Sequence, residues 1–142
     1  MLEMIASFYI FIIMSIIAKI HVYWMKGGLW PGVDTQDLIN KVIGKGNTFP
    51  STGECLFVTV VFIIMGLFPL LVYMKIDIGL SAESIKYVYL LFALIFLIRA
   101  AAMLMSFLEK KATRIFVKYN RKYYSPLCFS LFLAYFSLYL HL

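Results

Sequence analysis

Four long apolar runs constrain the fold of this chain more than any other feature. They cover roughly residues 2–24, 55–74, 87–107 and 123–142. Each is long enough to cross the roughly 30 Å hydrocarbon core of a bilayer as a helix. Only helices and closed barrels satisfy the backbone in lipid, and these runs lack the alternation of barrel strands. The sequence therefore predicts an all-α membrane protein, a four-helix transmembrane bundle that forms a single domain over residues 1–142.

The composition agrees with a membrane protein and disfavours the usual soluble functions. Of the 142 residues, 63% are hydrophobic and only 14% are charged, whereas a soluble domain is about half apolar and about a quarter charged. The net charge of +6 does not indicate nucleic-acid binding, because the basic residues lie beside apolar runs. Cys55 and Cys128 are far apart in the sequence and suggest neither a disulfide framework nor a metal site. We expect no cofactor, no metal and no nucleic-acid partner.

The distribution of Lys and Arg predicts the orientation of the bundle. The first loop contains Lys26, Lys41 and Lys45, and the third loop is richer still, whereas only Lys75 and Lys86 flank the second. Loops rich in Lys and Arg stay in the cytoplasm. We therefore expect a multi-pass protein of the bacterial cytoplasmic (inner) membrane with both termini outside. The first run should remain as a span, since no signal-peptide cleavage site follows it.

The first loop carries the signals of a short interfacial helix. Asp34 is a suitable N-cap, Asp37 follows three residues later, and Gly44 is a stop signal. Apolar residues at helical spacing would give this helix one apolar face, formed by Val33, Leu38, Ile39, Val42 and Ile43. We expect the helix to lie in the plane of the lipid headgroups.

Arg99 is the polar residue that most needs an explanation, because it lies inside the third apolar run. A guanidinium in hydrocarbon costs several kcal/mol without a partner, and it cannot lose its proton. Arg99 lies about eight residues before the cytoplasmic end of its span, roughly 12 Å deep at 1.5 Å per residue. Its partner is either Glu54, in a structural ion pair, or an anionic ligand that enters from the inner leaflet.

The predicted topology brings other unusual side chains to the level of Arg99. The first span ends on the cytoplasmic side, and the second and fourth spans begin there. We predict an inner-leaflet pocket centred on Arg99, with binding residues from these ends and from the first loop: His21, Tyr23, Trp24, Trp30, Glu54 and Tyr124. The aromatic residues also fit an aromatic belt, and His21 also fits a packing role.

Two motifs carry a resemblance to a known family. The chain reads His21-Val22-Tyr23-Trp24, with Gly27-Gly28 and Trp30 close behind, and Tyr124-Ser125-Pro126-Leu127-Cys128 opens the fourth span. Together with an Arg in the third span, these motifs resemble a family of small bacterial four-helix integral membrane proteins of unknown function. The resemblance covers nearly the whole chain. It implies the fold and a shared inner-leaflet cluster, but no activity.

Three classes of function are compatible with these features. The first, which we prefer, is a non-enzymatic protein whose pocket binds an anionic membrane lipid or a segment of a partner protein through charge-assisted hydrogen bonds. The second is an immunity protein that neutralises a membrane-inserting bacterial toxin or secreted effector. The third is a membrane enzyme acting on a lipid-linked substrate, with His21 as acid/base and Arg99 as phosphate clamp. No catalytic triad is present, so no catalytic residue is assigned, and homo-oligomerisation is left open.

Overall fold

The structure, a computed structural model, describes residues 1–102 and 110–142, and in these ranges every regular element is a helix. Three helices of membrane length are α1 (Leu2–Met25), α3 (Thr52–Tyr73) and α4 (Ala82–Ala102). The fourth is one continuous stretch of α6 (Arg114–Tyr119), the π-helical turn η1 (Asn120–Tyr124) and α7 (Ser125–His141). The short α2 (Thr35–Val42) lies in the first loop. The all-α, four-helix prediction is confirmed, while residues 103–107 of the predicted third span lie outside the described ranges.

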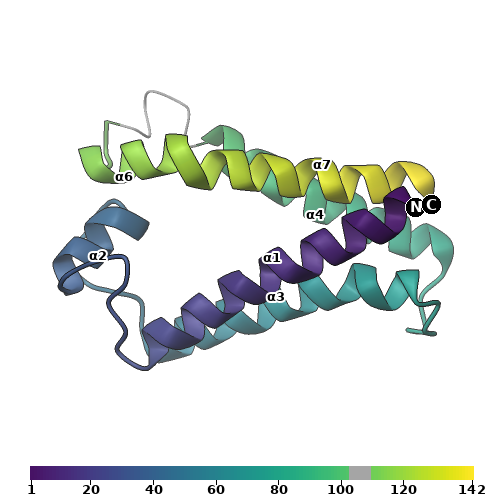
Figure 1. The fold of residues 1–142 in the computed structure, drawn as a ribbon, viewed down its shortest axis with the longest axis horizontal. Helices are drawn as coiled ribbons and strands as arrows, with labels where there is room; N and C mark the ends of the chain where they lie inside the picture. The colour runs from purple at the N-terminus through teal and green to yellow at the C-terminus, as the bar shows by residue number, and fades with distance from the viewer. Residues whose placement is uncertain (103–109) are drawn as a thin grey trace.

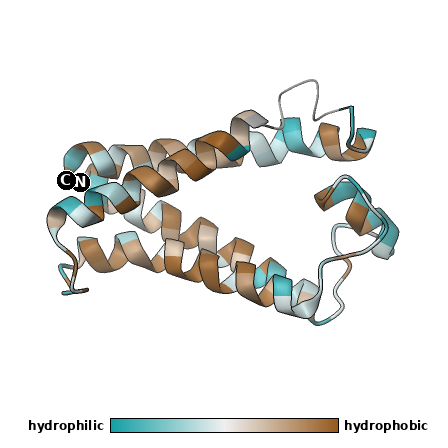
Figure 2. Ribbon diagram, turned by 180° about the vertical axis from the view of Figure 1, so that it is seen from behind, coloured by the Kyte–Doolittle hydropathy of each residue, from teal (hydrophilic) through white to brown (hydrophobic). Residues whose placement is uncertain are grey.

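All four long helices are long and apolar enough to cross a membrane. Hydrophobic residues extend along most of their length, whereas hydrophilic residues gather near the two ends of the bundle (Figure 2). Large apolar side chains such as Phe57 and Ile98 are exposed on the surface, as expected where lipid replaces water. The fourth helix begins at Arg114, nine residues before the predicted start of its span, because the charges that end an apolar run do not end a helix.

The four long helices form two pairs. α1 packs along α3, and α4 packs along α7. The pairs come together near the chain termini, where α1 meets α7, and move apart toward the opposite end, which carries α2 and α6 (Figure 1). We call these two ends the narrow end and the wide end.

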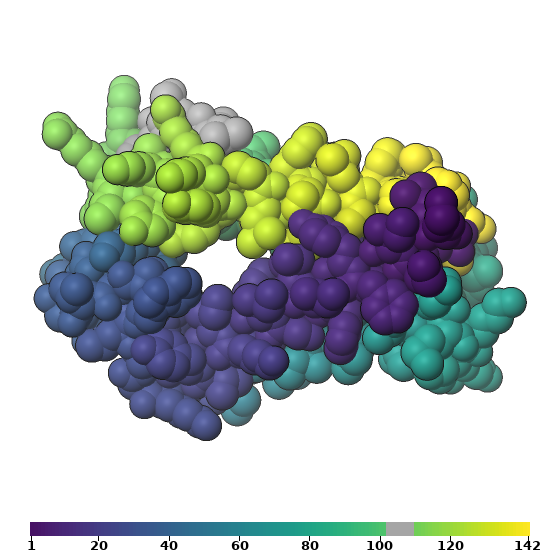
Figure 3. Space-filling view, viewed as in Figure 1, coloured from purple at the N-terminus to yellow at the C-terminus, as the bar shows by residue number. Residues whose placement is uncertain are grey.

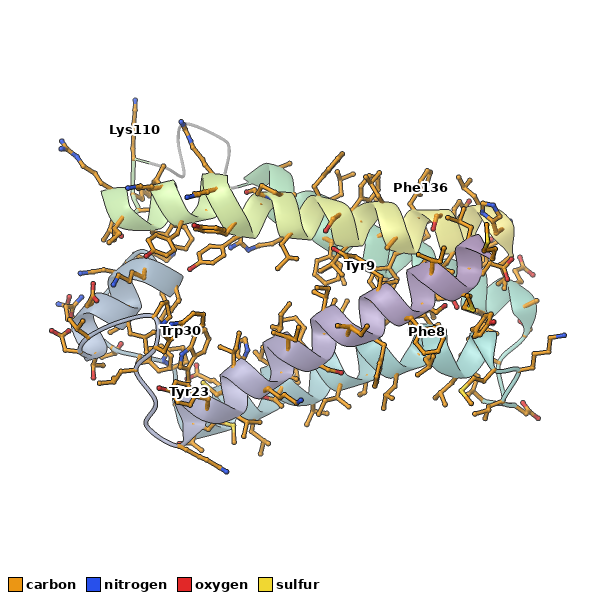
Figure 4. The ribbon with its side chains drawn as sticks, in the orientation of Figure 1. Phe8, Tyr9, Tyr23, Trp30, Lys110 and Phe136 are labelled. Atoms are coloured by element: carbon orange, nitrogen blue, oxygen red, sulfur yellow. The ribbon has the colours of Figure 1, made fainter. Side chains whose placement is uncertain are left out.

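The core fills the narrow end and joins the pairs. Gly66 of α3 lets α1 approach closely, because a Cβ at this position would lie 2.8 Å from the Cβ of Met14. Tyr135 of α7 is fully buried, and its hydroxyl donates to the backbone oxygen of Met65 at 2.8 Å. Tyr9 of α1 lies between α1 and α7 (Figure 4), with its hydroxyl 2.6 Å from that of Ser130.

The short helix α2 forms where its caps predict. The Asp34 carboxylate accepts a hydrogen bond from the backbone N–H of Asp37 at 2.8 Å. The Asp37 carboxylate accepts one from Lys41 Nζ at 2.7 Å, and this hydrogen bond lowers the pKa of Asp37 and raises the pKa of Lys41. Leu38 and Ile39 are buried, so this part of the predicted apolar face packs on protein.

Three hydrogen bonds connect α2 to the fourth helix across the wide end. Thr113 donates from its hydroxyl to the backbone oxygen of Asn40 at 2.6 Å and from its N–H to that of Gly44 at 2.8 Å. The Tyr124 hydroxyl donates to the backbone oxygen of Lys41 at 3.1 Å. Because the chain connects α2 to α1 on one side and to α3 on the other, α2 bridges the two helix pairs.

Candidate functional site

A cavity of about 770 Å³ lies between the two helix pairs at the wide end. It is visible as an opening between α1, α2 and the fourth helix (Figure 3). One wall, which we call the first wall, comes from α1 and α3 and includes Ile17, His21, Trp24, Glu54, Cys55 and Val58. The second wall comes from α4, η1 and α7 and includes Arg99, Tyr124, Leu127 and Cys128. Val42, Ile43, Phe49 and Pro50 line the cavity from α2 and the segment that follows it.

Arg99, on the second wall, joins a hydrogen-bond chain that is partly buried at Arg99 and buried behind the wall. Its Nη1 donates to Oδ1 of Asn120 at 3.2 Å. Asn120 is only 1% exposed, and its Nδ2 donates to the Ser125 hydroxyl at 3.0 Å. That hydroxyl donates in turn to the backbone oxygen of Ala100 at 3.2 Å. A neutral amide therefore orients the guanidinium without neutralising its charge.

The π-helical turn η1 makes this arrangement possible. Residues five apart in an α-helix point about 140° away from each other, at 100° per residue. In η1 the backbone N–H of Ser125 bonds to the carbonyl of Asn120, and this wider turn brings the two side chains toward one face. Pro126 follows directly, and its ring crowds the preceding turn and lacks the N–H that an α-helix would use. Such π-turns are frequent at functional sites.

Glu54 lies on the first wall and does not pair with Arg99. Its Oε2 accepts hydrogen bonds from the Ser51 N–H at 2.7 Å and from the Ser51 hydroxyl at 2.8 Å. The Ser51 hydroxyl also accepts from the Glu54 N–H at 3.3 Å, which completes a capping box at the start of α3. The one ion pair in the described part of the chain joins Lys41 to Asp37. The alternative of a structural Arg99–Glu54 pair is therefore wrong for this structure.

His21 and Trp24 form the aromatic part of the first wall. Nδ1 of His21 lies 2.8 Å from the backbone oxygen of Ile17 and must donate to it, because a carbonyl only accepts. In the neutral ring, Nε2 is then an acceptor. The ring centroids of His21 and Trp24 are 5.0 Å apart, and Phe49 packs edge-to-face on Trp24 at 5.8 Å.

Tyr23 and Trp30 are not among the residues that line the cavity. The indole N–H of Trp24 donates to the backbone oxygen of Trp30 at 2.7 Å, and the Trp30 N–H donates to the Tyr23 hydroxyl at 3.5 Å. Both side chains lie at the wide end, near the C-terminal end of α1 (Figure 4). Tyr23 is 47% exposed and Trp30 is 64% exposed. Their hydrogen bonds support the orientation of Trp24.

Asn120 and Ser125 do not line the cavity but support Arg99 through hydrogen bonds, and the sequence did not single them out as binding residues. Asn120 precedes Arg121 and Lys122, so a sequence pattern places it in a basic loop. One sequence signal could have identified Asn120, namely its position five residues before Ser125-Pro126. A proline removes one α-helical hydrogen bond and crowds the turn before it. Cys55 and Cys128, for which the sequence suggests neither a disulfide nor a metal site, also line the cavity.

The walls can recognise an anionic group that is attached to an apolar chain. Arg99 supplies charge-assisted donors, whereas His21 and Glu54 supply acceptors. Most of the remaining lining residues are apolar. In residues 1–102 and 110–142, no group of three His, Cys, Asp or Glu side chains is placed to hold a metal ion.

Residues 14–135 match the profile of a family described as "Protein of unknown function (DUF3995)". The match covers most of the chain and contains every residue that we predicted to bind a ligand. No curated protein and no solved structure matches the chain.

Proposed function

We propose a function for this chain, which belongs to the DUF3995 family of proteins of unknown function. The proposal rests on the cavity at its wide end. The protein is a non-enzymatic membrane protein that binds a lipid. Arg99 binds an anionic group in the lipid headgroup, and the apolar residues of the two walls contact part of a lipid chain. This proposal chooses the lipid over the partner segment that the sequence also allows.

The observation that carries the proposal is a guanidinium on the wall of a mostly apolar cavity. Arg99 lies in a helix long and apolar enough to span a membrane, and its partner Asn120 is neutral. A charge within the membrane is costly unless it is compensated, and such charges commonly mark functional sites. A phosphate can accept two parallel hydrogen bonds from a guanidinium, which would supply that compensation.

The size and the opening of the cavity support a lipid as the ligand. Its volume of about 770 Å³ lies within the range of about 300–1,000 Å³ that is typical of small-molecule sites. The opening faces sideways from the long helices (Figure 3), which is where lipid surrounds a transmembrane bundle. A lipid chain could therefore enter without leaving the hydrocarbon.

We also propose that the wide end faces the cytoplasm of a bacterium, with the cavity in the inner leaflet of the inner membrane. The support is the uneven charge distribution, because cytoplasmic loops are enriched in Lys and Arg. Nine of the 13 basic residues lie in residues 26–45 or 110–122, at the wide end: Lys26, Lys41, Lys45, Lys110, Lys111, Arg114, Lys118, Arg121 and Lys122.

Arg99→Gln tests lipid binding directly. We expect the purified variant to retain roughly tenfold less phospholipid than the wild type, because the charge-assisted hydrogen bonds to phosphate are lost. Native mass spectrometry of the protein in mild detergent measures the bound lipid. The matched control is Lys86→Gln, which removes a positive charge near the other end of the same helix and should leave lipid retention unchanged. Equal retention by Arg99→Gln and wild type would contradict the proposal.

The immunity and enzyme alternatives stay predictions from the sequence. Neither is favoured over lipid binding by any contact in the described residues. His21, which an enzyme would use as acid/base, donates from Nδ1 to its own helix, and this contact serves a binding role equally well.

A further inference from the structure

The two walls of the cavity carry opposite charges that do not meet. Arg99 on the second wall is bonded to Asn120, and Glu54 on the first wall is bonded to Ser51. Both residues line the same cavity, yet no ion pair joins them in the described ranges, where the one ion pair is elsewhere. Opposite charges that face one cavity and stay apart are complementary to a ligand that carries both signs.

The surroundings of Glu54 suit a cation. The capping box occupies its Oε2, whereas its Oε1 accepts no hydrogen bond from the residues that the structure describes. The rings of Trp24 and Phe49 line the cavity together with Glu54 and pack edge-to-face at 5.8 Å. A cation at this position would be stabilised by the carboxylate and by the aromatic rings.

We propose that the ligand is an aminophospholipid, with its phosphate on Arg99 and its primary ammonium between Glu54 and the rings of Trp24 and Phe49. This inference rests on the proposed function and adds the chemical class of the headgroup. A primary ammonium has N–H donors for the carboxylate, which a quaternary ammonium lacks. A purely anionic headgroup would leave Oε1 of Glu54 without a donor and would place two negative charges in the same cavity.

Tryptophan fluorescence can measure this binding, because Trp24, one of the two tryptophans of the chain, lines the cavity. The other, Trp30, accepts the hydrogen bond of the Trp24 indole through its backbone oxygen. The full chain in detergent is titrated with dihexanoyl phosphatidylethanolamine, phosphatidylglycerol and phosphatidylcholine. We expect phosphatidylethanolamine to bind about tenfold more tightly than the other two, since only it satisfies both walls. Equal or tighter binding of phosphatidylglycerol by the wild type would overturn the inference, and this comparison needs no variant.

Two variants separate failure of this inference from failure of the proposed function. Glu54→Gln keeps an acceptor for the capping box and should lose the preference for phosphatidylethanolamine while still binding phosphatidylglycerol. Arg99→Gln should weaken the binding of all three lipids. A preference that survives in Glu54→Gln overturns the inference alone, whereas unchanged binding of all three lipids by Arg99→Gln overturns both. Glu83→Gln, in the first turn of α4, is the matched control and should preserve the preference.

Free phosphoethanolamine distinguishes a lipid from a soluble source of the same headgroup. It carries both charges but no chains, so it cannot contact the apolar residues of the walls. We expect it to bind at least about tenfold more weakly than the dihexanoyl lipid, because burial of each CH₂ contributes about 0.8 kcal/mol. Equal affinity for the two compounds would overturn the assignment of a lipid.

Discussion

We infer that Asn120 orients Arg99 and leaves its charge available to the proposed ligand. Its amide oxygen accepts a hydrogen bond from the guanidinium at 3.2 Å but carries no charge. Asn120→Asp would place a carboxylate at the same buried position, where it would compete with an anionic ligand for Arg99. We expect lipid affinity to fall about tenfold while the fold is kept, since the Arg99 contact is preserved.

Fluorescence titration with dihexanoyl phospholipid measures the affinity of Asn120→Asp, and circular dichroism checks its helix content. Asn40→Asp is the matched control, because the Asn40 side chain contacts Gln36 in the first loop and does not line the cavity. The role assigned to Asn120 is wrong if the Asp variant binds lipid as tightly as the wild type.

At the residue scale, a charged residue within an apolar run is easy to recognise in the sequence, but its hydrogen-bond partners are not. Arg99 stands out because a guanidinium in hydrocarbon is rare. Asn120 does not stand out, because it sits beside basic residues and acquires its role only through the turn that aligns it with Ser125. Trp30 is the opposite case. The sequence drew attention to its side chain, but its backbone oxygen makes the contact, by accepting the hydrogen bond of the Trp24 indole.

At the element scale, the junction between α2 and α6 depends on Gly44. Gly44 and Gly46 have φ values of +82° and +84°, so alanine at either position meets the left-handed penalty of roughly 1–2 kcal/mol. Only at Gly44 would the added Cβ also meet Phe116, 2.5 Å from its Cγ, whereas at Gly46 it would meet nothing within 4 Å. Phe116 is buried, so it has little room to move.

Gly44→Ala should therefore lower the unfolding temperature more than Gly46→Ala does. It should also raise the hydrogen-exchange rate of the amides in α2, because the contacts of α2 with α6 would be lost. Thermal unfolding in detergent and hydrogen–deuterium exchange measure the two effects. Equal effects of the two substitutions would mean that packing between Gly44 and Phe116 does not hold α2 in place.

The sequence predicts elements well where their signals are local. The caps of α2 and the long apolar runs depend on residues that are close in the sequence. Both could therefore be predicted without tertiary information. The start of the fourth helix was harder to predict, because Thr113 caps α6 by accepting from the Phe116 N–H at 3.3 Å, well before the apolar run begins. The turn η1 was not predicted, because the contact that accompanies it, between Arg99 and Asn120, joins residues 21 positions apart in the sequence.

At the scale of the whole molecule, the packed core and the cavity occupy opposite ends of the same four helices. Aromatic and small side chains such as Tyr135 and Ala93 fill the narrow end, so the helix pairs are fixed there. At the wide end α2 bridges the pairs (Figure 1), and the cavity that Arg99 lines lies between them. The bundle can therefore accommodate a ligand without giving up its main core.

The charges at the wide end predict an orientation of the molecule in the membrane. Basic loops stay in the cytoplasm, so the narrow end, with both termini, should face outward. Alkaline phosphatase, which is active only outside the cytoplasm, should be active when fused after Leu142 or after Gly79 in the second loop, and inactive when fused after Lys111 in the third. Enzyme activity normalised to the amount of each fusion measures this pattern. The reverse pattern would place the cavity in the outer leaflet, and the proposed lipid ligand would then have to be sought there.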